Sequence, residues 1–339
     1  MKRLVAALVA IVVCAGAQVA GSANAAAPAP LGVASIATLT DRTAAGYQAE
    51  AAAIRGVGAS WIRIVMNWNE TETAPGHFSW TRLDAAVAAA RAANLQVLGL
   101  VEGPAPAWAA TVPLAPNAPP RQASDYGAFA RQLAARYRNT VHAWEIWNEP
   151  NIPAYWISPN AAAYVAVLRA AYTSIKQVAP EATVLSGGLS PDPRGISPTT
   201  FVKQMYAAGG GAYFDAIALH PYTFPYAARS DPRGRQLAVS GVRMVMDWKG
   251  QWGKKIWITE WGQATGTGPD SVNESAQASI IMSSLDYFQA KSRMGPLFLF
   301  TSKDWKTDPS LTEFNYGLYR YDYSPKPVVA QLKKRYGVA

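Results

Sequence analysis

Two glutamates attract attention because each closes a short apolar run that is typical of a β-strand. Glu149 lies in the run EIWNEPN at residues 145–151, and Glu260 lies in the run IWITEWG at residues 256–262. His220 and Tyr222 lie between them in the run HPY. Two carboxyl groups that face one site can divide the hydrolysis of a glycosidic bond. One protonates the leaving oxygen, and the other attacks or stabilises the anomeric carbon.

Short apolar strands alternate with helical stretches along the chain. The predicted strands are 32–36, 61–66, 96–101, 141–147, 183–187, 214–219, 256–259 and 296–300. The predicted helices are 47–54, 82–93, 126–137, 161–178, 200–208, 237–248, 275–291 and 327–336. These repeats predict a (β/α)8 TIM barrel of the α/β class in a single domain. A doubly wound open sheet is the alternative, but it usually carries a glycine-rich phosphate loop, and the glycines at 209–211 follow a helix instead.

The barrel interpretation places the candidate residues at one end of the molecule, because catalytic residues of such barrels lie at the C-terminal ends of the strands. Glu149 follows the fourth predicted strand, and Glu260 ends the seventh. His220 and Tyr222 follow the sixth. We expect the carboxyl groups of Glu149 and Glu260 to lie about 5–5.5 Å apart, the spacing of enzymes that retain the anomeric configuration.

The first residues have the pattern of a secretory signal. Lys2 and Arg3 precede an apolar run over residues 4–13, and residues 23–25, ANA, match a cleavage site. We predict a signal peptide over 1–25, a catalytic barrel over 26–339, and secretion to the exterior or cell wall. Cys14 is the only cysteine, so the mature protein would contain no disulfide. Lipid attachment at Cys14 is the alternative.

The formal net charge of +9 favours contact with polyanions such as acidic polysaccharide, or simply solubility. No nucleic-acid-binding motif accompanies it. The three histidines lack the spacing of metal ligands. We therefore expect that the protein uses no metal or cofactor and binds no nucleic acid. We also expect a monomer that has no membrane attachment after the signal peptide is cleaved.

The runs around the two glutamates resemble the signatures of clan A retaining glycoside hydrolases. Residues 147–150, WNEP, are similar to the acid/base signature, and residues 259–262, TEWG, are similar to the nucleophile signature. Residues 63–80 resemble the second strand of this clan with its loop, and residues 317–327 resemble the run into its last helix. The pattern is most similar to family 39 and family 5 enzymes, including secreted bacterial exopolysaccharide hydrolases.

This resemblance implies roles for individual residues. Glu149 would be the general acid/base, and Glu260 would be the nucleophile. Asn148 would bind the 2-hydroxyl group of the sugar, and His220 would be the site histidine that follows strand six. A strand-end cap is the alternative for Asn148, and a buried structural histidine is the alternative for His220.

Arg63 and Tyr222 are candidates to orient Glu260 through hydrogen bonds. Arg63 alternates with Val65 and Asn67 in its strand, so these side chains point the same way. An arginine inside a barrel needs a carboxylate partner. Glu145 competes for it, and a structural Arg63–Glu145 ion pair is the alternative role.

Tryptophans in loops and at strand ends predict sugar-binding surfaces, because the apolar faces of sugar rings pack well on indole. We assign this role to Trp68, Trp261 and Trp305. A position in the core is the alternative for each of them.

These features predict a secreted retaining glycoside hydrolase that cleaves O-glycosidic bonds within a polysaccharide or oligosaccharide by double displacement. An exo-acting β-xylosidase or arabinofuranosidase is the first alternative. A non-catalytic glycan-binding barrel is the second.

Overall fold

A computed structural model describes residues 29–338 and contains a closed barrel of eight parallel strands. Around the barrel the strands follow the order β1-β2-β5-β6-β7-β8-β9-β10, and β10 pairs with β1. Their bounds are β1 Leu31–Ala34, β2 Trp61–Asn67, β5 Gln96–Glu102, β6 Val141–Asn148, β7 Thr183–Gly188, β8 Ala216–Leu219, β9 Lys255–Trp261 and β10 Met294–Leu299. The predicted barrel is confirmed, and each predicted strand overlaps one of these eight.

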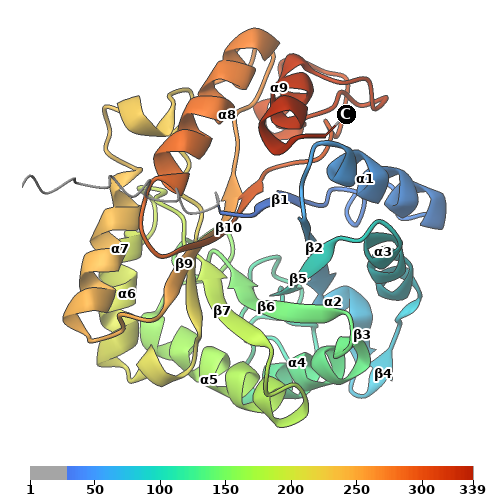
Figure 1. The fold of residues 1–339 in the computed structure, drawn as a ribbon. Helices are drawn as coiled ribbons and strands as arrows, with labels where there is room; N and C mark the ends of the chain where they lie inside the picture. Colours follow the sequence, from blue (N-terminus) through green and yellow to red (C-terminus); the bar gives the residue numbers. More distant parts are fainter. Residues whose placement is uncertain (1–28, 339) are drawn as a thin grey trace, which may run out of the picture.

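Helices surround the strands, as Figure 1 shows. The main helices are α1 Ala44–Gly56, α3 Thr81–Ala92, α4 Ala123–Tyr137, α5 Ala161–Val178, α6 Pro198–Ala207, α7 Leu237–Trp248, α8 Glu274–Gln289 and α9 Pro327–Tyr336. In α5, for example, Tyr164, Leu168 and Ile175 are buried at helical spacing, so one face packs on the barrel. The Asn160 side chain accepts a hydrogen bond from the backbone N–H of Ala163 and caps this helix.

The barrel interior has an apolar layer beneath a polar one. The apolar layer comprises Leu98, Ala143, Leu185, Ala216, Ala218, Trp257 and Phe298. Successive inward side chains of a strand are two residues apart. Glu145 therefore follows Ala143, and His220 follows Ala218, on the inward face nearer the C-terminal ends of the strands. The apolar layer thus supports a polar cluster at one mouth of the barrel.

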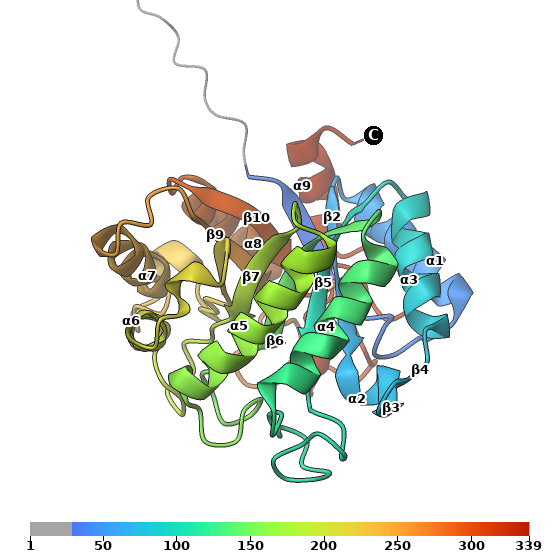
Figure 2. The same ribbon diagram turned by 90° about the horizontal axis from the view of Figure 1, so that it is seen from below.

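One connection is more elaborate than predicted. Between β2 and α3 the chain forms the short helix α2 Trp68–Thr71 and a hairpin of β3 Glu72–Ala74 with β4 His77–Phe78. Figure 2 shows these elements at the end of the barrel opposite the C-terminus. Short 3-10 turns lie at η1 Gly210–Ala212, η2 Ala228–Ser230 and η3 Thr312–Phe314. Elements of two to four residues carry too little periodicity to be predicted.

The predicted signal peptide, residues 1–25, lies outside the described residues. Between residues 29 and 338, no helix has both the length and the apolar character needed to cross a membrane.

Candidate active site

Glu149 and Glu260 meet at the C-terminal mouth of the barrel. Glu149 directly follows β6, and Glu260 is the next-to-last residue of β9. A carboxylate oxygen of Glu149 and one of Glu260 lie within 4.8 Å of each other. This separation fits the spacing of retaining enzymes, about 5–5.5 Å, and is shorter than the roughly 6.5–9.5 Å of inverting enzymes. The predicted pairing of the two glutamates is present.

Both oxygens of the Glu260 carboxylate accept hydrogen bonds from protein side chains. The Arg63 guanidinium donates through Nη1 to Oε1 at 2.5 Å, and the Tyr222 hydroxyl donates to Oε2 at 3.0 Å. Glu260 retains 13% of its side-chain exposure, so it remains partly open to the mouth. One donor lies in β2 and the other follows β8, and together they orient the carboxylate as a nucleophile requires. The structure thus places Arg63 and Tyr222 in the orienting positions that we predicted.

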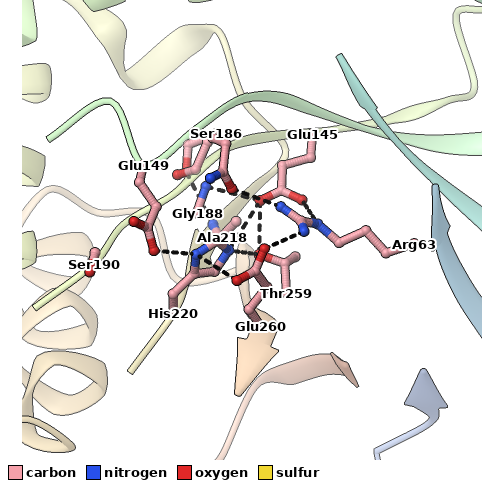
Figure 3. A network of polar contacts seen from close by, with 12 residues as sticks. Arg63, Glu145, Glu149, Ser186, Gly188, Ser190, Ala218, His220, Thr259 and Glu260 are labelled. Carbon is pink, nitrogen blue, oxygen red and sulfur yellow. Dashed lines mark hydrogen bonds and ion pairs between the residues drawn. The ribbon is translucent and has the colours of Figure 1, made fainter. Parts of the chain in front are cut away.

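Glu145 is the second partner of Arg63 and is completely buried. Its carboxylate accepts hydrogen bonds from Arg63 Nε at 2.6 Å, Thr259 Oγ1 at 2.8 Å and the Gly188 N–H at 2.9 Å. Burial alone would raise the pKa of Glu145, but the charge of Arg63 and the proximity of His220 outweigh it and lower the pKa to about 2. The structural ion pair and the orienting contact with Glu260 therefore coexist on one guanidinium (Figure 3).

Arg63 also determines how Asn148 is oriented. Its Nη2 lies 3.0 Å from Asn148 Oδ1. Because a guanidinium only donates hydrogen bonds, the amide oxygen must face it, and the amide N–H groups are then presented elsewhere. This leaves a donor next to the two glutamates, where the resemblance implied a contact with a sugar hydroxyl.

His220 lies between Glu149 and Thr259 and forms a hydrogen bond with each of them. Its Nδ1 lies 2.8 Å from Glu149 Oε1, and its Nε2 lies 3.0 Å from Thr259 Oγ1. Thr259 donates its only hydroxyl proton to Glu145, so it accepts from Nε2–H. A second proton is then needed between Nδ1 and Glu149. Figure 3 shows His220 lying between the two carboxylates.

Burial and charge keep this second proton in place near neutral pH. Burial raises the pKa of Glu149, and the hydrogen bond to His220 opposes this without cancelling it. Burial lowers the pKa of His220, but the charge of Glu260 and contacts with Glu145 and Glu149 raise it to about 9. The pair thus holds a proton that Glu149 can deliver as a general acid.

The backbone around Glu149 adopts an unusual conformation. Trp147 and Glu149 have φ values of 69° and 41°, in the left-handed region that side chains other than glycine rarely adopt. The Trp147 indole packs over Gly103, where a Cβ would lie only 2.1 Å from the ring, and donates to the Tyr155 carbonyl at 3.0 Å. Packing of this indole holds the end of β6 in the conformation that presents Asn148 and Glu149 to the site.

The position of His220 depends on a glycine in the neighbouring strand. A Cβ on Gly188 would lie 2.0 Å from His220 Nε2, so any larger residue would displace the imidazole. The same Gly188 backbone donates to Glu145 and accepts from the Glu149 N–H at 3.1 Å. The pair of glycines that ends β7 was the available sequence signal for this close approach, although we did not predict it.

Two of the tryptophan predictions are wrong. The indole of Trp68 is 0% exposed, stacks on Phe129 and donates to Glu72 at 2.8 Å. Trp261 is also 0% exposed and packs edge-on against Phe288 of α8. Neither ring offers a face to a sugar, because local packing directs both outward into the layer between strands and helices.

Trp305 has a different environment. It is partly exposed and contacts Phe300, which lies 6.5 Å from Tyr222 between ring centres. Its indole nitrogen has no hydrogen-bond partner among the described residues. Its predicted role in binding sugar stays a prediction, supported by this chain of aromatic rings that leads to Tyr222.

Glu102 is a residue of the site that sequence reasoning missed. It ends β5, and its ionisation is influenced by Arg63 and by the charges of Glu145, Glu149 and Glu260. Burial and the charges of the three glutamates raise its pKa to about 8, although the charge of Arg63 opposes this rise. The available signal was a carboxylate at the end of the third predicted strand, the same position that identified the other two.

Glu149, His220 and Glu260 lie close enough together to suggest a metal-binding set. However, Arg63 and Tyr222 already donate to both oxygens of Glu260, and a second cation would be repelled by the guanidinium. We keep the prediction that the reaction uses no metal.

Several solved structures are similar to this one. A family 39 glycoside hydrolase from Bacteroides cellulosilyticus WH2 matches with a TM-score of 0.71 and 24% identity, covering 90% of this chain and 63% of that one. GH5_18 from Streptomyces cattleya in complex with GlcNAc matches with 0.71 and 18%, covering 91% and 81%. A monomeric β-xylosidase from Caulobacter crescentus CB15 matches with 0.65 and 19%, covering 90% and 67%. At these identities the similarity establishes the shared barrel fold.

No match was found among curated protein sequences. The family described as Cellulase (glycosyl hydrolase family 5) matches residues 27–298, most of the chain. This agrees with the clan A signatures and with a barrel that carries a glutamate after its fourth strand and another at the end of its seventh. The protein therefore belongs to glycosyl hydrolase family 5.

Proposed function

We propose that this protein hydrolyses O-glycosidic bonds of a polysaccharide or oligosaccharide by double displacement, with retention of the anomeric configuration. The observation that carries the proposal is the separation of Glu149 and Glu260, whose closest carboxylate oxygens lie within 4.8 Å. Their surroundings differ as the two roles require. Glu149 shares a proton with His220, whereas Glu260 accepts hydrogen bonds from Arg63 and Tyr222.

In the first step, an oxygen of Glu260 attacks the anomeric carbon while the bond from that carbon to the leaving oxygen breaks. Glu149 gives its proton to the leaving oxygen, which departs as an alcohol. His220 keeps its Nε2 proton, which is directed at Thr259, and Glu149 is left ionised. The product is a glycosyl ester on Glu260.

In the second step, a water molecule attacks the anomeric carbon of this ester from the opposite side. Glu149 accepts a proton from the water, and the bond to Glu260 breaks to restore the carboxylate. Arg63 and Tyr222 are positioned to stabilise the carboxylate that leaves. Both steps invert the carbon, so the net result is retention.

Cleavage within a polysaccharide chain, by a protein secreted after removal of residues 1–25, is the mode of action that we favour. The family name, cellulase, supports a polymeric substrate. Exo-acting hydrolysis, as by a β-xylosidase or arabinofuranosidase, is the second candidate, because one similar structure is titled a monomeric β-xylosidase. A non-catalytic glycan-binding barrel is disfavoured because both glutamates keep their orienting partners.

The direct test is product analysis with a panel of polysaccharides and 4-nitrophenyl glycosides. We expect proton NMR of the first product to show the same anomer as the substrate. A mixture of internal fragments from a polymer would indicate endo action, and release of single sugars from chain ends would indicate exo action. An inverted first product would contradict the mechanism.

We expect kcat/KM for an aryl glycoside to have a bell-shaped pH dependence. Activity should fall at low pH because a protonated carboxyl group cannot attack the anomeric carbon. It should also fall as the pH rises toward about 9, because raised pKa values mean that the Glu149–His220 pair keeps its proton through neutral pH and loses it only there. Steady-state kinetics across this range would measure both limbs.

The control for the alkaline limb compares two histidines. His220→Gln removes the shared proton site and should change the alkaline limb. His142→Gln, at an exposed position at the start of β6, should leave the profile unaltered. A profile that is flat from acidic to alkaline pH would contradict the roles assigned to the two glutamates.

A further inference from the structure

Glu102 lies at the mouth of the barrel on a strand that the proposed mechanism does not use. In β5 the side chains of Leu98, Leu100 and Glu102 are two residues apart and so lie on the same face of the strand. Leu98 belongs to the apolar layer inside the barrel. Glu102 is paired across the sheet with Asn67 of β2, the same strand that carries Arg63. Its side chain therefore points inward at the level of the catalytic groups, where it remains partly exposed.

The backbone on both sides of Glu102 is held firmly. The preceding carbonyl, of Val101, accepts a hydrogen bond from the Tyr126 hydroxyl at 2.5 Å. The following carbonyl, of Gly103, accepts one from Asn67 Nδ2 at 2.8 Å. The Trp147 indole also packs directly on Gly103, which has no room for a Cβ. A side chain on such a backbone is preorganised, which is typical of residues that bind a ligand.

The carboxyl group of Glu102, in contrast, has no hydrogen-bond or ion-pair partner among residues 29–338. Arg63, the cation whose charge acts on Glu102, already directs its Nε, Nη1 and Nη2 to Glu145, Glu260 and Asn148. A polar group that is partly withdrawn from water normally finds a partner. Water can fill this role in the free protein, and a bound molecule that displaces the water must replace its hydrogen bonds.

The charges around Glu102 indicate what kind of molecule this is. Glu145, Glu149 and Glu260 all disfavour its ionisation, Arg63 favours it, and the hydroxyls of Tyr126 and Tyr155 are the other titratable groups close enough to sense it. Burial together with these carboxylates raises the pKa of Glu102 to about 8, so the group is largely neutral at pH 7. A neutral carboxyl donates one hydrogen bond and accepts others, which matches sugar hydroxyl groups.

We propose that Glu102 is a specificity-determining residue whose carboxyl group hydrogen-bonds to a hydroxyl group of the sugar undergoing reaction. This inference rests on the proposed hydrolase function, because it takes Glu149 and Glu260 as the reacting pair. According to this proposal, the ligand is an uncharged sugar with a free hydroxyl group at the position that Glu102 contacts.

The test combines variants of Glu102 with deoxy substrates. Among 4-nitrophenyl glucosides, mannosides and xylosides, the one that the wild type hydrolyses fastest is compared with its monodeoxy analogues. We expect Glu102→Ala to lose about ten- to a hundredfold in kcat/KM on the parent substrate, the cost of an unpaired hydroxyl. One analogue lacks the contacted hydroxyl. On that analogue the wild type should show the same loss of about ten- to a hundredfold in kcat/KM, and Glu102→Ala should lower kcat/KM by no more than about a further twofold.

Glu102→Gln is the conservative control, because an amide also donates and accepts hydrogen bonds without a charge. It should keep most of the wild-type activity. Glu181→Ala, at an exposed position before β7, is the matched control for loss of a surface glutamate and should behave as the wild type. Thermal unfolding of each variant would verify that the fold is intact.

Three results would overturn the proposal. The first is a loss with Glu102→Ala that is equal on every deoxy analogue, since that would indicate a structural role. The second is unaltered activity with Glu102→Ala. The third is a Glu102→Gln variant as impaired as Glu102→Ala, since an ionised carboxylate would then be required, as for an amino sugar.

Direct binding separates this proposal from the proposed function. Saturation-transfer NMR measures the affinity of the wild type and the Glu102 variants for the free parent sugars without any turnover. Binding that depends on Glu102 in a protein that cleaves no glycoside would support the residue's role and reject the hydrolase. If the protein hydrolyses a glycoside, and neither hydrolysis nor binding depends on Glu102, the hydrolase function would be supported and the role of Glu102 rejected.

Discussion

Replacing Glu260 by alanine is expected to reduce hydrolysis by roughly 10⁶-fold, the order of loss seen when an enzyme with a covalent mechanism loses its nucleophile. Replacing Glu149 by alanine should have a smaller and substrate-dependent effect. A poor leaving group needs the proton and should lose about 10²–10⁴-fold. An aryl glycoside with a good leaving group needs little protonation and should still form the glycosyl-enzyme, which then accumulates because no base activates water.

Added azide should distinguish the two variants by the configuration of the product. Azide attacks without deprotonation, so it should restore turnover of Glu149→Ala and give a glycosyl azide of retained configuration through the intermediate on Glu260. In Glu260→Ala no intermediate forms, and azide in the vacated space should give the inverted product. Product NMR and mass spectrometry of the trapped intermediate are the measurements.

The Glu181→Ala variant serves as the control, because this glutamate is exposed and lies before β7 at the opposite end of the strands. It should have wild-type kinetics. If azide gave the inverted product with Glu149→Ala and the retained product with Glu260→Ala, the two assignments would be reversed. Full activity in both single variants would place the reaction elsewhere.

Substitution of Arg63 by methionine should have the largest effect on stability. The guanidinium is 2% exposed and bonds both Glu145 and Glu260. Without it, Glu145 and Glu260 lose their guanidinium partner, and removal of one partner of a buried pair typically costs about 3–5 kcal/mol. Chemical denaturation at pH 7 would measure this loss. The freed Glu260 should also lower kcat/KM by about a hundredfold, the order caused by small misplacement of a catalytic group.

The pH dependence of this destabilisation follows from Glu145. Its pKa is depressed to about 2 in the folded protein, so in the wild type its contribution to stability is present above its unfolded pKa of about 4.3 and is lost as pH falls through 2. Without Arg63 this contribution disappears. The difference in unfolding free energy between wild type and Arg63→Met should therefore be greatest above about pH 4.3 and decrease below it.

A second substitution separates the two roles of Arg63. Adding Glu145→Gln to Arg63→Met removes the uncompensated buried charge, so stability should partly recover while activity stays low. Arg131→Met, at an exposed position of α4, should change neither quantity. If the double variant regained activity as well, the orienting contact with Glu260 would be unimportant. If Arg63→Met were as stable as Arg131→Met, the ion pair would contribute nothing.

Much of the architecture could be predicted from the sequence because its signals are local. Apolar runs of strand length alternate with helical periodicity, and this alternation is sufficient to predict a closed parallel barrel. A carboxylate that directly follows or ends such a strand must then lie at the C-terminal mouth. For this reason Glu149 and Glu260 could be placed together although they are more than one hundred positions apart in the chain.

Side-chain direction beyond the regular part of a strand could not be predicted in the same way. Alternation holds for Arg63 and Glu145, which lie within β2 and β6 and point inward as expected. At Trp147 the backbone enters the left-handed region, and alternation no longer applies to Asn148 and Glu149. Their direction depends on the packing of the Trp147 indole over Gly103, a contact between β6 and the end of β5.

The sequence by itself thus determined the barrel, the mouth at which chemistry takes place, and the two glutamates that meet there. Only the tertiary structure decided that Trp68 and Trp261 belong to the core, that Arg63 serves two carboxylates at once, and that His220 shares a proton with Glu149. The same holds for the unpartnered carboxyl of Glu102. The physical reason is that burial, pairing and proton sharing depend on neighbours from other strands, whereas periodicity describes only one segment at a time.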